Sequence, residues 1–148
     1  MKVRVEEIAD LEGTEVVVRC RARDGEVERV VDALGFLDEA VVAKKDGRSY
    51  RVPLADVFYF ENVDDRTFVN LRKEVLETAM RLHEVESTLR GSTFVRVGRN
   101  TIVDAAKIAS FKSALNGRME ARLQNGETVE ISRAYVGAIK AMLGGTRR

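Results

Sequence analysis

The sequence contains few of the residues that metal and nucleophilic sites require: one cysteine (Cys20), one histidine (His83) and no tryptophan among 148 residues. Zinc sites, iron–sulfur centres, disulfide frameworks and Ser-His-Asp triads all need more than this. His83 lies between Arg81 and Glu86 in a helical pattern, which predicts a surface histidine rather than a general base. Cys20 ends an apolar run and is expected to be a small buried residue. A Gly-rich phosphate loop is also missing, so we expect no enzyme, cofactor, metal site or small-molecule substrate.

Long hydrophobic runs are absent too. No stretch approaches the length that crosses a membrane, and no charged start followed by an apolar stretch resembles a signal peptide. The single cysteine fits a reducing compartment. Hydrophobic residues make up 45% of the chain and charged residues 33%, so a core can form in a chain of this length. We therefore expect a soluble, cytoplasmic protein.

The net charge of +1 is unevenly distributed along the chain. Residues 1–40 carry 6 Lys/Arg against 11 Asp/Glu, a net charge of −5, whereas residues 92–148 carry 10 against 4, a net charge of +6. A basic C-terminal half is compatible with a polyanionic partner such as nucleic acid, and equally with an unevenly charged but solvated surface.

Turn residues divide most of the chain into short strands. Proline occurs once, at Pro53, so long coil linkers are not expected. Asp46-Gly47, Asn116-Gly117 and Asn125-Gly126 each lie between alternating or β-branched runs and predict two-residue hairpins. Asp64-Asp65 fits either a turn or a divalent-cation ligand pair. The predicted strands cover residues 40–45, 48–52, 57–61, 67–71, 93–97, 108–115, 118–124 and 128–132, whereas residues 73–78 fit helix and strand equally well.

Three helices and an N-terminal strand complete the pattern. Asp24 can cap a helix that ends at Gly35, and residues 15–20 form a β-branched run typical of a strand. Residues 1–38 are therefore expected to be a short acidic strand–helix segment in front of a β domain over residues 39–148. The apolar stripes of the three helices comprise Val27, Val30, Val31 and Leu34; Leu82, Val85 and Leu89; and Tyr135, Ile139, Met142 and Leu143. The first stripe either caps the β domain or forms a dimer or partner surface.

Basic side chains follow the ends of two predicted strands. Residues 93–104 read T-F-V-R-V-G-R-N-T-I-V-D, in which a strand runs into a polar, cationic turn. Residues 129–135 read V-E-I-S-R-A-Y, in which Arg133 lies in the first turn of a helix after Ser132. A cation is slightly unfavourable at a helix N-terminus, and its presence there is reasonable where an anion binds. The alternative interpretation is that Arg133 is an ordinary surface arginine without a binding role.

These stretches, together with three others, resemble the LytTR family of bacterial DNA-binding domains from Ala40 to about Gly144. The other stretches are V-F-Y-F-E-N-V-D-D-R-T-F-V-N-L (57–71), R-L-H-E-V-E-S-T-L (81–89) and L-N-G-R-M-E-A-R-L-Q-N-G (115–126). The resemblance implies a mostly β fold with short helices, an elongated arrangement of antiparallel strands in which loops enter the major groove. It also implies that residues 74–78 form a strand paired with residues 67–71.

The resemblance implies a set of DNA-binding residues. Arg66 precedes a strand where the family has a polar or basic contact, Arg96 and Arg99 match the arginines of a turn, and Arg133 matches the arginine of an I-S-R motif. Asn100 replaces the family's usual serine. The sequence departs from the family at Gly98, which replaces a histidine, and at Asp104, which replaces an asparagine. Gly98 removes one donor from the turn.

Antiparallel geometry adds Arg118 to this set. The hairpin formed by residues 118–124 and 128–132 returns the chain to the end of the sheet at which it began. Arg118 is therefore expected at the same edge as Arg133, as a secondary phosphate contact.

The resemblance implies sequence-specific binding of double-stranded DNA as a bacterial transcriptional regulator. The alternative is a protein-interaction module that kept the fold and lost DNA binding. Many LytTR proteins carry a phosphoacceptor receiver domain, and residues 1–38 are too short for one. The chain resembles stand-alone regulators, some of which are restrained by small membrane proteins. Two copies are expected to bind paired half-sites and to self-associate on DNA.

Overall fold

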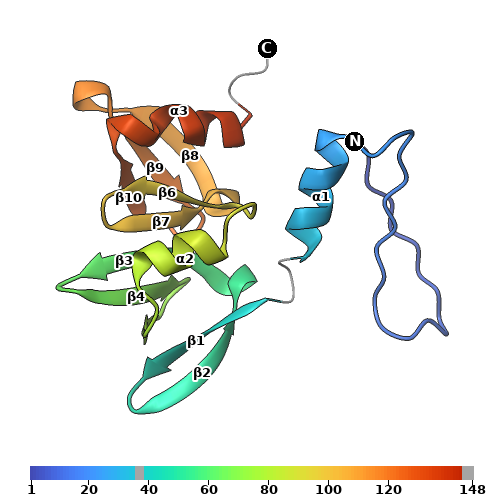
Figure 1. Ribbon diagram of the computed structural model, residues 1–148, viewed down its shortest axis with the longest axis horizontal. Coiled ribbons are helices and arrows are strands. Elements are labelled where there is room, and N and C mark those ends of the chain that lie inside the picture. The colour runs from blue at the N-terminus through green and yellow to red at the C-terminus, as the bar shows by residue number, and fades with distance from the viewer. Residues whose placement is uncertain (36–38, 145–148) are drawn as a thin grey trace.

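The computed structural model describes residues 1–35 and 39–144, and these residues form mainly antiparallel β-structure (Figure 1). Residues 36–38 and 145–148 lie outside the described residues, and with them the expected segment boundary at residue 38. In the described part, every strand pairing is antiparallel, and the strands form two sheets. The expected fold class, mostly β with short helices, is confirmed.

The larger sheet has seven strands in the order β2-β1-β5-β4-β3-β7-β6. The segment at residues 73–78, ambiguous by its own pattern, forms a strand against β4, as the resemblance implied. A four-residue strand over residues 101–104 was not predicted. The strands are β1 (Ala40–Lys45), β2 (Arg48–Pro53), β3 (Val57–Val63), β4 (Arg66–Leu71), β5 (Val75–Thr78), β6 (Phe94–Gly98) and β7 (Thr101–Asp104).

The smaller sheet has three strands in the order β10-β9-β8. Short turns of 3₁₀ helix join several strands, and three α-helices complete the described structure. The strands are β8 (Ile108–Ser113), β9 (Met119–Leu123) and β10 (Thr128–Ile131). The helices are α1 (Gly25–Gly35), α2 (Leu82–Thr88) and α3 (Arg133–Met142), with 3₁₀ turns η1 (Leu54–Asp56), η2 (Ala105–Lys107) and η3 (Leu115–Gly117).

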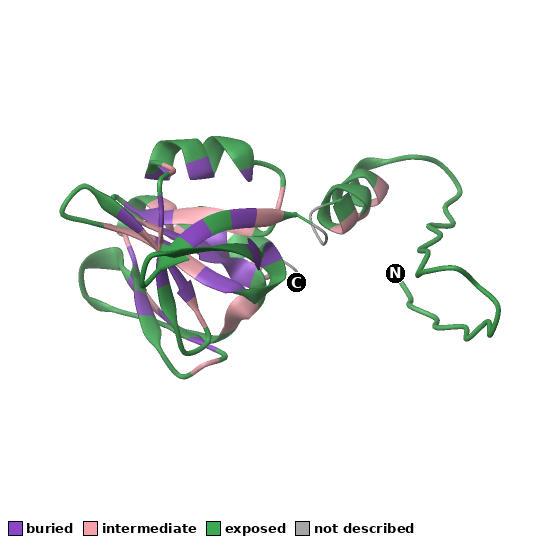
Figure 2. Cartoon of the chain, turned by 90° about the horizontal axis from the view of Figure 1, so that it is seen from below, coloured by how far each residue is buried: buried purple, intermediate pink, exposed green. Residues whose placement is uncertain are grey.

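Two hydrophobic clusters hold the sheets and helices together. In the first, α2 packs on the larger sheet through its predicted stripe of Leu82, Val85 and Leu89. In the second, Ile139 of α3 packs against the alternating inner face of β9 and against Val97 of β6. The second cluster therefore holds α3 against β6. Figure 2 shows that the buried residues lie in the sheets and the helices packed on them, whereas the first 24 residues are exposed. Met142, predicted to point inward, is 42% exposed.

The turns predicted from the sequence differ from one another in loop length and in backbone conformation. Asp46 and Gly47 both have positive φ (52° and 78°) and make the predicted two-residue hairpin. Asp64 and Asp65 do the same (52° and 62°), so this pair forms a turn. At Asn116-Gly117, the loop is longer than predicted, because the Ala114 amide bonds to the Arg118 carbonyl at 2.9 Å across three intervening residues. At residues 125–126, only Gly126 has positive φ, and the Leu123 amide bonds to the Glu127 carbonyl, again a three-residue loop.

The N-terminal segment contains the clearest error of prediction. Asp24 caps α1 as expected, since its carboxylate accepts the Val27 amide at 3.1 Å. The predicted strand at residues 15–20 does not form, because no neighbouring strand pairs with it within the described chain. Cys20, predicted to be buried, is exposed for the same reason.

Candidate nucleic-acid interface

Two hairpin turns of the larger sheet lie side by side at one edge of the molecule. In the register of β3 and β7, Glu61 faces Thr101, so the β3–β4 turn lies beside the β6–β7 turn. The two turns are joined where the Asn62 amide donates to the Asn100 carbonyl at 2.8 Å. Both hairpins end on the left side of Figure 1. This arrangement brings the loop before β4 and the loop after β6 together.

The start of α3 and the turn of η3 continue the same edge. The Ser132 amide donates to the Val97 carbonyl at 2.8 Å, which fixes the helix start beside the end of β6. In the smaller sheet, Ile131 faces Met119. Ser132, which follows Ile131, and Arg118, which precedes Met119, therefore lie at the same end of this sheet. We call the surface formed by residues 62–66, 98–101, 114–118 and 132–133 the turn edge. Five of the six predicted DNA-binding residues belong to it, and the sixth, Arg96, lies directly behind its second turn.

Arg133 is exposed at the first position of α3, and its side chain rests on the η3 turn. A Cβ atom placed on Gly117 would lie 2.8 Å from Cδ and 3.1 Å from Cγ of Arg133, so the arginine stem passes over the glycine. The first turn of α3 contains no acidic residue, and Ser132 makes no side-chain cap. Among the residues that the structure describes, the guanidinium of Arg133 has no hydrogen-bond or ion-pair partner. It is therefore available to an external acceptor at a helix end whose N–H groups favour anions.

Arg99 and Asn100 form the two-residue turn between β6 and β7. Both are exposed, and within the described ranges 1–35 and 39–144 neither side chain has a polar partner. The backbone of the turn is held by the Asn62–Asn100 bond and by pairing of Gly98 with Thr101. The turn therefore presents the Arg99 guanidinium and the Asn100 amide from a rigid backbone.

Arg96 is held differently from the other predicted contacts. Its side chain is 20% exposed, and its guanidinium donates to the Gly98 carbonyl at 2.9 Å and to the Arg99 carbonyl at 3.1 Å. A third bond at 3.2 Å reaches the Glu86 carboxylate on α2. Because Arg96 binds two carbonyls of the turn and one acid of a helix, it fixes the turn rather than projecting from it.

Arg66 and Arg118 each have an acidic neighbour. Arg66 donates from Nε to Glu77 at 3.0 Å and lies 5.4 Å from the centre of the Phe68 ring. The hydrogen bond from Arg66 lowers the pKa of the Glu77 carboxyl, and Glu77 in turn raises the pKa of Arg66, so the pair stays charged at neutral pH. Arg118 lies 3.5 Å from Glu130, a long contact between two exposed side chains.

Sequence reasoning missed the acids that hold these arginines. Glu77 and Glu86 lie 11 and 10 residues from their partners, on other elements, so no local spacing links them. It also missed Leu115, an apolar side chain of the η3 turn that is 83% exposed. An apolar residue directly before Asn116-Gly117 was the only available signal.

Asp104, where the resemblance implies an asparagine, lies opposite Phe94 at the end of β7 that is remote from the β6–β7 turn. The carboxylate accepts the Thr93 hydroxyl at 2.6 Å and the Ala106 amide at 3.0 Å. It also pairs at 3.1 Å with Lys107, whose ammonium donates to the Ala55 carbonyl at 2.8 Å. With side-chain exposures of 6% and 15%, the two charges compensate each other inside the protein. Asp104 is therefore a structural residue that joins β7 to η1.

The described part of the chain lacks two further kinds of feature. It contains no group of three or more His, Cys, Asp or Glu side chains that could hold a metal ion. None of its helices combines the length and the apolar character that crossing a membrane requires. His83, as predicted, is exposed.

The part of the chain that forms the turn edge is similar to known proteins. Residues 47–144 match the family model of the LytTr DNA-binding domain. The chain is similar to the sensory transduction protein LytT of Enterococcus faecalis (strain ATCC 700802 / V583), with 28% identity over 111 residues. That match covers 74% of this chain and 46% of the relative, so the chain spans about half of the relative's length. It is also similar to the solved LytTr DNA-binding domain of a protein described as a methyl-accepting/DNA response regulator from Bacillus cereus. There the TM-score is 0.67 at 27% identity, and 72% of this chain and 98% of that one are covered.

Proposed function

Because the chain belongs to the LytTr DNA-binding domain family, we propose that it binds double-stranded DNA sequence-specifically and regulates transcription. In this proposal the turn edge enters the major groove, and side chains on its turns contact base edges and phosphates. The observation that carries the proposal is the convergence of three turns and the start of α3 at one edge, where three of the predicted contacts have side chains without a partner within the described structure. Those side chains are Arg99, Asn100 and Arg133.

The proposed contacts fall into two groups. Arg133, Arg99 and Asn100 read bases, since each extends from a rigid turn and is free to donate to an acceptor. Arg66 and Arg118 bind phosphates, because their exposed acidic partners can be exchanged for a backbone phosphate at little cost. Arg96, whose side chain is largely buried, stabilises the β6–β7 turn by donating to two of its carbonyls. Gly98 supplies no side-chain donor, so Arg99 and Asn100 carry the recognition by this turn.

The proposed partners follow from the size of one such domain. Two copies bind paired half-sites on one face of the duplex and associate with each other there. The protein acts in the bacterial cytoplasm, with a small membrane protein as its regulatory partner. These partners rest on the family resemblance and on the single-domain footprint.

Enrichment of DNA from a random pool, followed by affinity measurements across a salt series, tests the proposal. A DNA-binding protein loses affinity with a log–log slope near −0.9 for each phosphate neutralised. We expect an enriched consensus and a slope of roughly −3 to −4, from the Arg66 and Arg118 phosphate contacts of two bound copies. A flat response without a consensus would instead favour a protein-interaction module on the same fold.

A further inference from the structure

The first twenty residues carry an unusual concentration of exposed apolar side chains. Val3 and Val5 are each 83% exposed, and Val16 and Val17 are 62% and 71% exposed. The following helix, α1, buries no residue, although its stripe of valines and leucine has the spacing of a packing face. This surface is much more apolar than a solvated tail requires.

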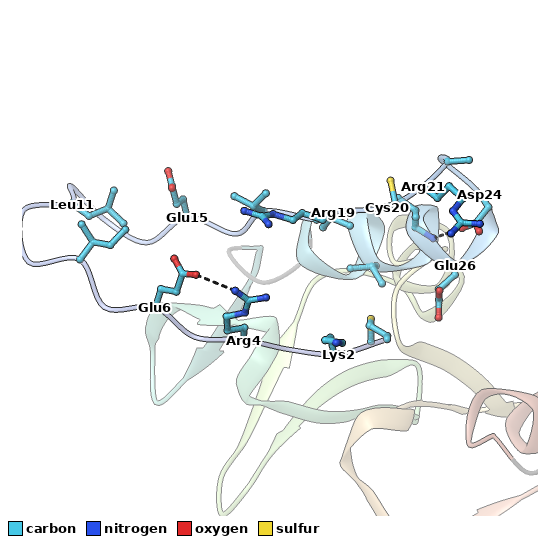
Figure 3. A pocket seen from close by; sticks show the side chains of 17 residues that line it. Lys2, Arg4, Glu6, Leu11, Glu15, Arg19, Cys20, Arg21, Asp24 and Glu26 are labelled. Atoms are coloured by element: carbon cyan, nitrogen blue, oxygen red, sulfur yellow. Dashed lines mark hydrogen bonds and ion pairs between the residues drawn. The ribbon is translucent and has the colours of Figure 1, made fainter.

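The backbone of this segment is also unpaired. Residues 2–8 and 14–20 run beside each other in opposite directions, linked by a turn in which the Leu11 amide bonds to the Ile8 carbonyl at 3.2 Å (Figure 3). Side chains of both runs and of α1 line an open hollow of about 690 Å³ between them. Within the described residues, no backbone hydrogen bond joins the two runs. A β-branched run with free N–H and C=O groups is suited to pairing with another chain.

The charge pattern of residues 14–20, T-E-V-V-V-R-C, identifies the partner. In an antiparallel pair of two identical copies centred on Val17, Glu15 of each copy lies opposite Arg19 of the other, and Val16 lies opposite Val18. Both pairs occur twice by symmetry, as in a closed two-fold interface. Pairing of the two runs within one chain around residues 10–13 would instead place Arg4 opposite Arg19. Like charges directly opposite are destabilising, so this register is less favourable within one chain than the paired register between two copies.

We propose that residues 14–20 are a self-association surface, at which two copies of the chain pair as antiparallel strands about a two-fold axis at Val17. Two strands alone are marginal in water. The α1 helices follow directly after the strands and supply an apolar layer against the face formed by Val16 and Val18. The surface exists without DNA, so its test is independent of the proposed DNA binding.

Sedimentation of the full chain without DNA, combined with charge reversal, tests this register. The native chain should be dimeric at micromolar concentration. Glu15→Arg and Arg19→Glu should each weaken the dimer by roughly tenfold or more, because two attractive pairs become repulsive. The double variant E15R/R19E should restore it. Glu12→Arg, a charge reversal in the turn, should leave the dimer intact.

Cross-linking gives a second readout that does not depend on charge. In a Cys20→Ser background, Val17→Cys should form an intermolecular disulfide on mild oxidation, because this residue faces its own copy at the axis. Val42→Cys in the same background, on the exposed face of β1, should form no disulfide-linked dimer. A native chain that is monomeric, a double variant that fails to recover, or an uncross-linked Val17→Cys chain would each overturn the proposal.

Discussion

Arg133 and Arg118 lie at the same end of the smaller sheet, yet the contacts proposed for them differ. Arg133 has no partner among the described residues and starts a helix, and a guanidinium can donate two bonds to guanine O6 and N7. Arg133→Ala should cost about 1–3 kcal/mol in specific binding and relax preference at one base position. The melting temperature should barely change, because losing a cation from a helix start is neutral or slightly favourable.

Two related variants make this prediction specific. Arg133→Lys should recover part of the affinity without the base preference. Arg118→Ala should weaken binding to all sequences alike and make the salt slope shallower by about one, as expected for a phosphate contact. Binding isotherms and thermal melts on all three proteins supply the measurements. An Arg133→Ala protein that melts several degrees lower but binds unchanged would identify this arginine as structural.

Arg96 is predicted to affect DNA binding indirectly, by fixing the turn that carries Arg99 and Asn100. Lysine at this position keeps the charge but cannot reach the two carbonyls of Gly98 and Arg99 and the carboxylate of Glu86 together. Arg96→Lys should therefore lower specific affinity by about 1–2 kcal/mol and blur the base preference read by Arg99 and Asn100, while leaving the salt slope unchanged. Arg118→Ala, compared in the same assay, should make the slope shallower by about one, because it removes a phosphate contact. If Arg96→Lys kept full specificity, a direct phosphate contact would be the better explanation.

At the scale of elements, two glycine turns at opposite ends of β9 form a matched pair. Gly117 and Gly126 both have positive φ (77° and 92°), but only Gly117 lies under the stem of Arg133. Each substitution by alanine should lower stability by about 1 kcal/mol or more, since a Cβ is strained at positive φ. Only Gly117→Ala should also impair DNA binding, because the new methyl group displaces Arg133. Equal binding by the two variants would mean that the position of Arg133 over η3 is unimportant.

The strands and turns also show which features could be predicted from the sequence and which could not. Alternation gave β9 its inner face of Met119, Ala121 and Leu123, and turn chemistry located Asp46-Gly47, because both signals are local. The strand expected at residues 15–20 failed, since strand formation needs a partner that the pattern of one run does not contain. Asn116-Gly117 became a longer loop because the register of β8 and β9 sets the loop length.

The same division applies to the candidate site. Motif positions brought Arg66, Arg99, Asn100 and Arg133 to one edge, and antiparallel geometry added Arg118. The enclosure of Arg96 could not be predicted, because Glu86 approaches it from a separate helix. Long-range pairing, rather than residue type, decides which of these arginines projects outward.

At the scale of the whole molecule, the acidic first 40 residues and the basic last 57 suggest that association and DNA binding use different parts of the chain. Two copies on DNA should then require half-sites on one face of the duplex, about one helical turn or a multiple apart. Inserting about five base pairs between the half-sites should abolish cooperative binding, as measured by gel shift. Affinity indifferent to the insertion would rule out pairing on DNA.

Mapping of amide chemical shifts tests most directly whether the turn edge is the DNA-binding face. The chain is 16.5 kDa, within easy reach of solution NMR, and can be titrated with a duplex carrying its selected site. The largest shifts should fall on residues 62–66, 98–101, 114–118 and 132–133, while the turns at Asp46-Gly47 and Asn125-Gly126 stay unchanged. Large shifts at those two turns, with the turn edge unaffected, would contradict this assignment of the DNA-binding face.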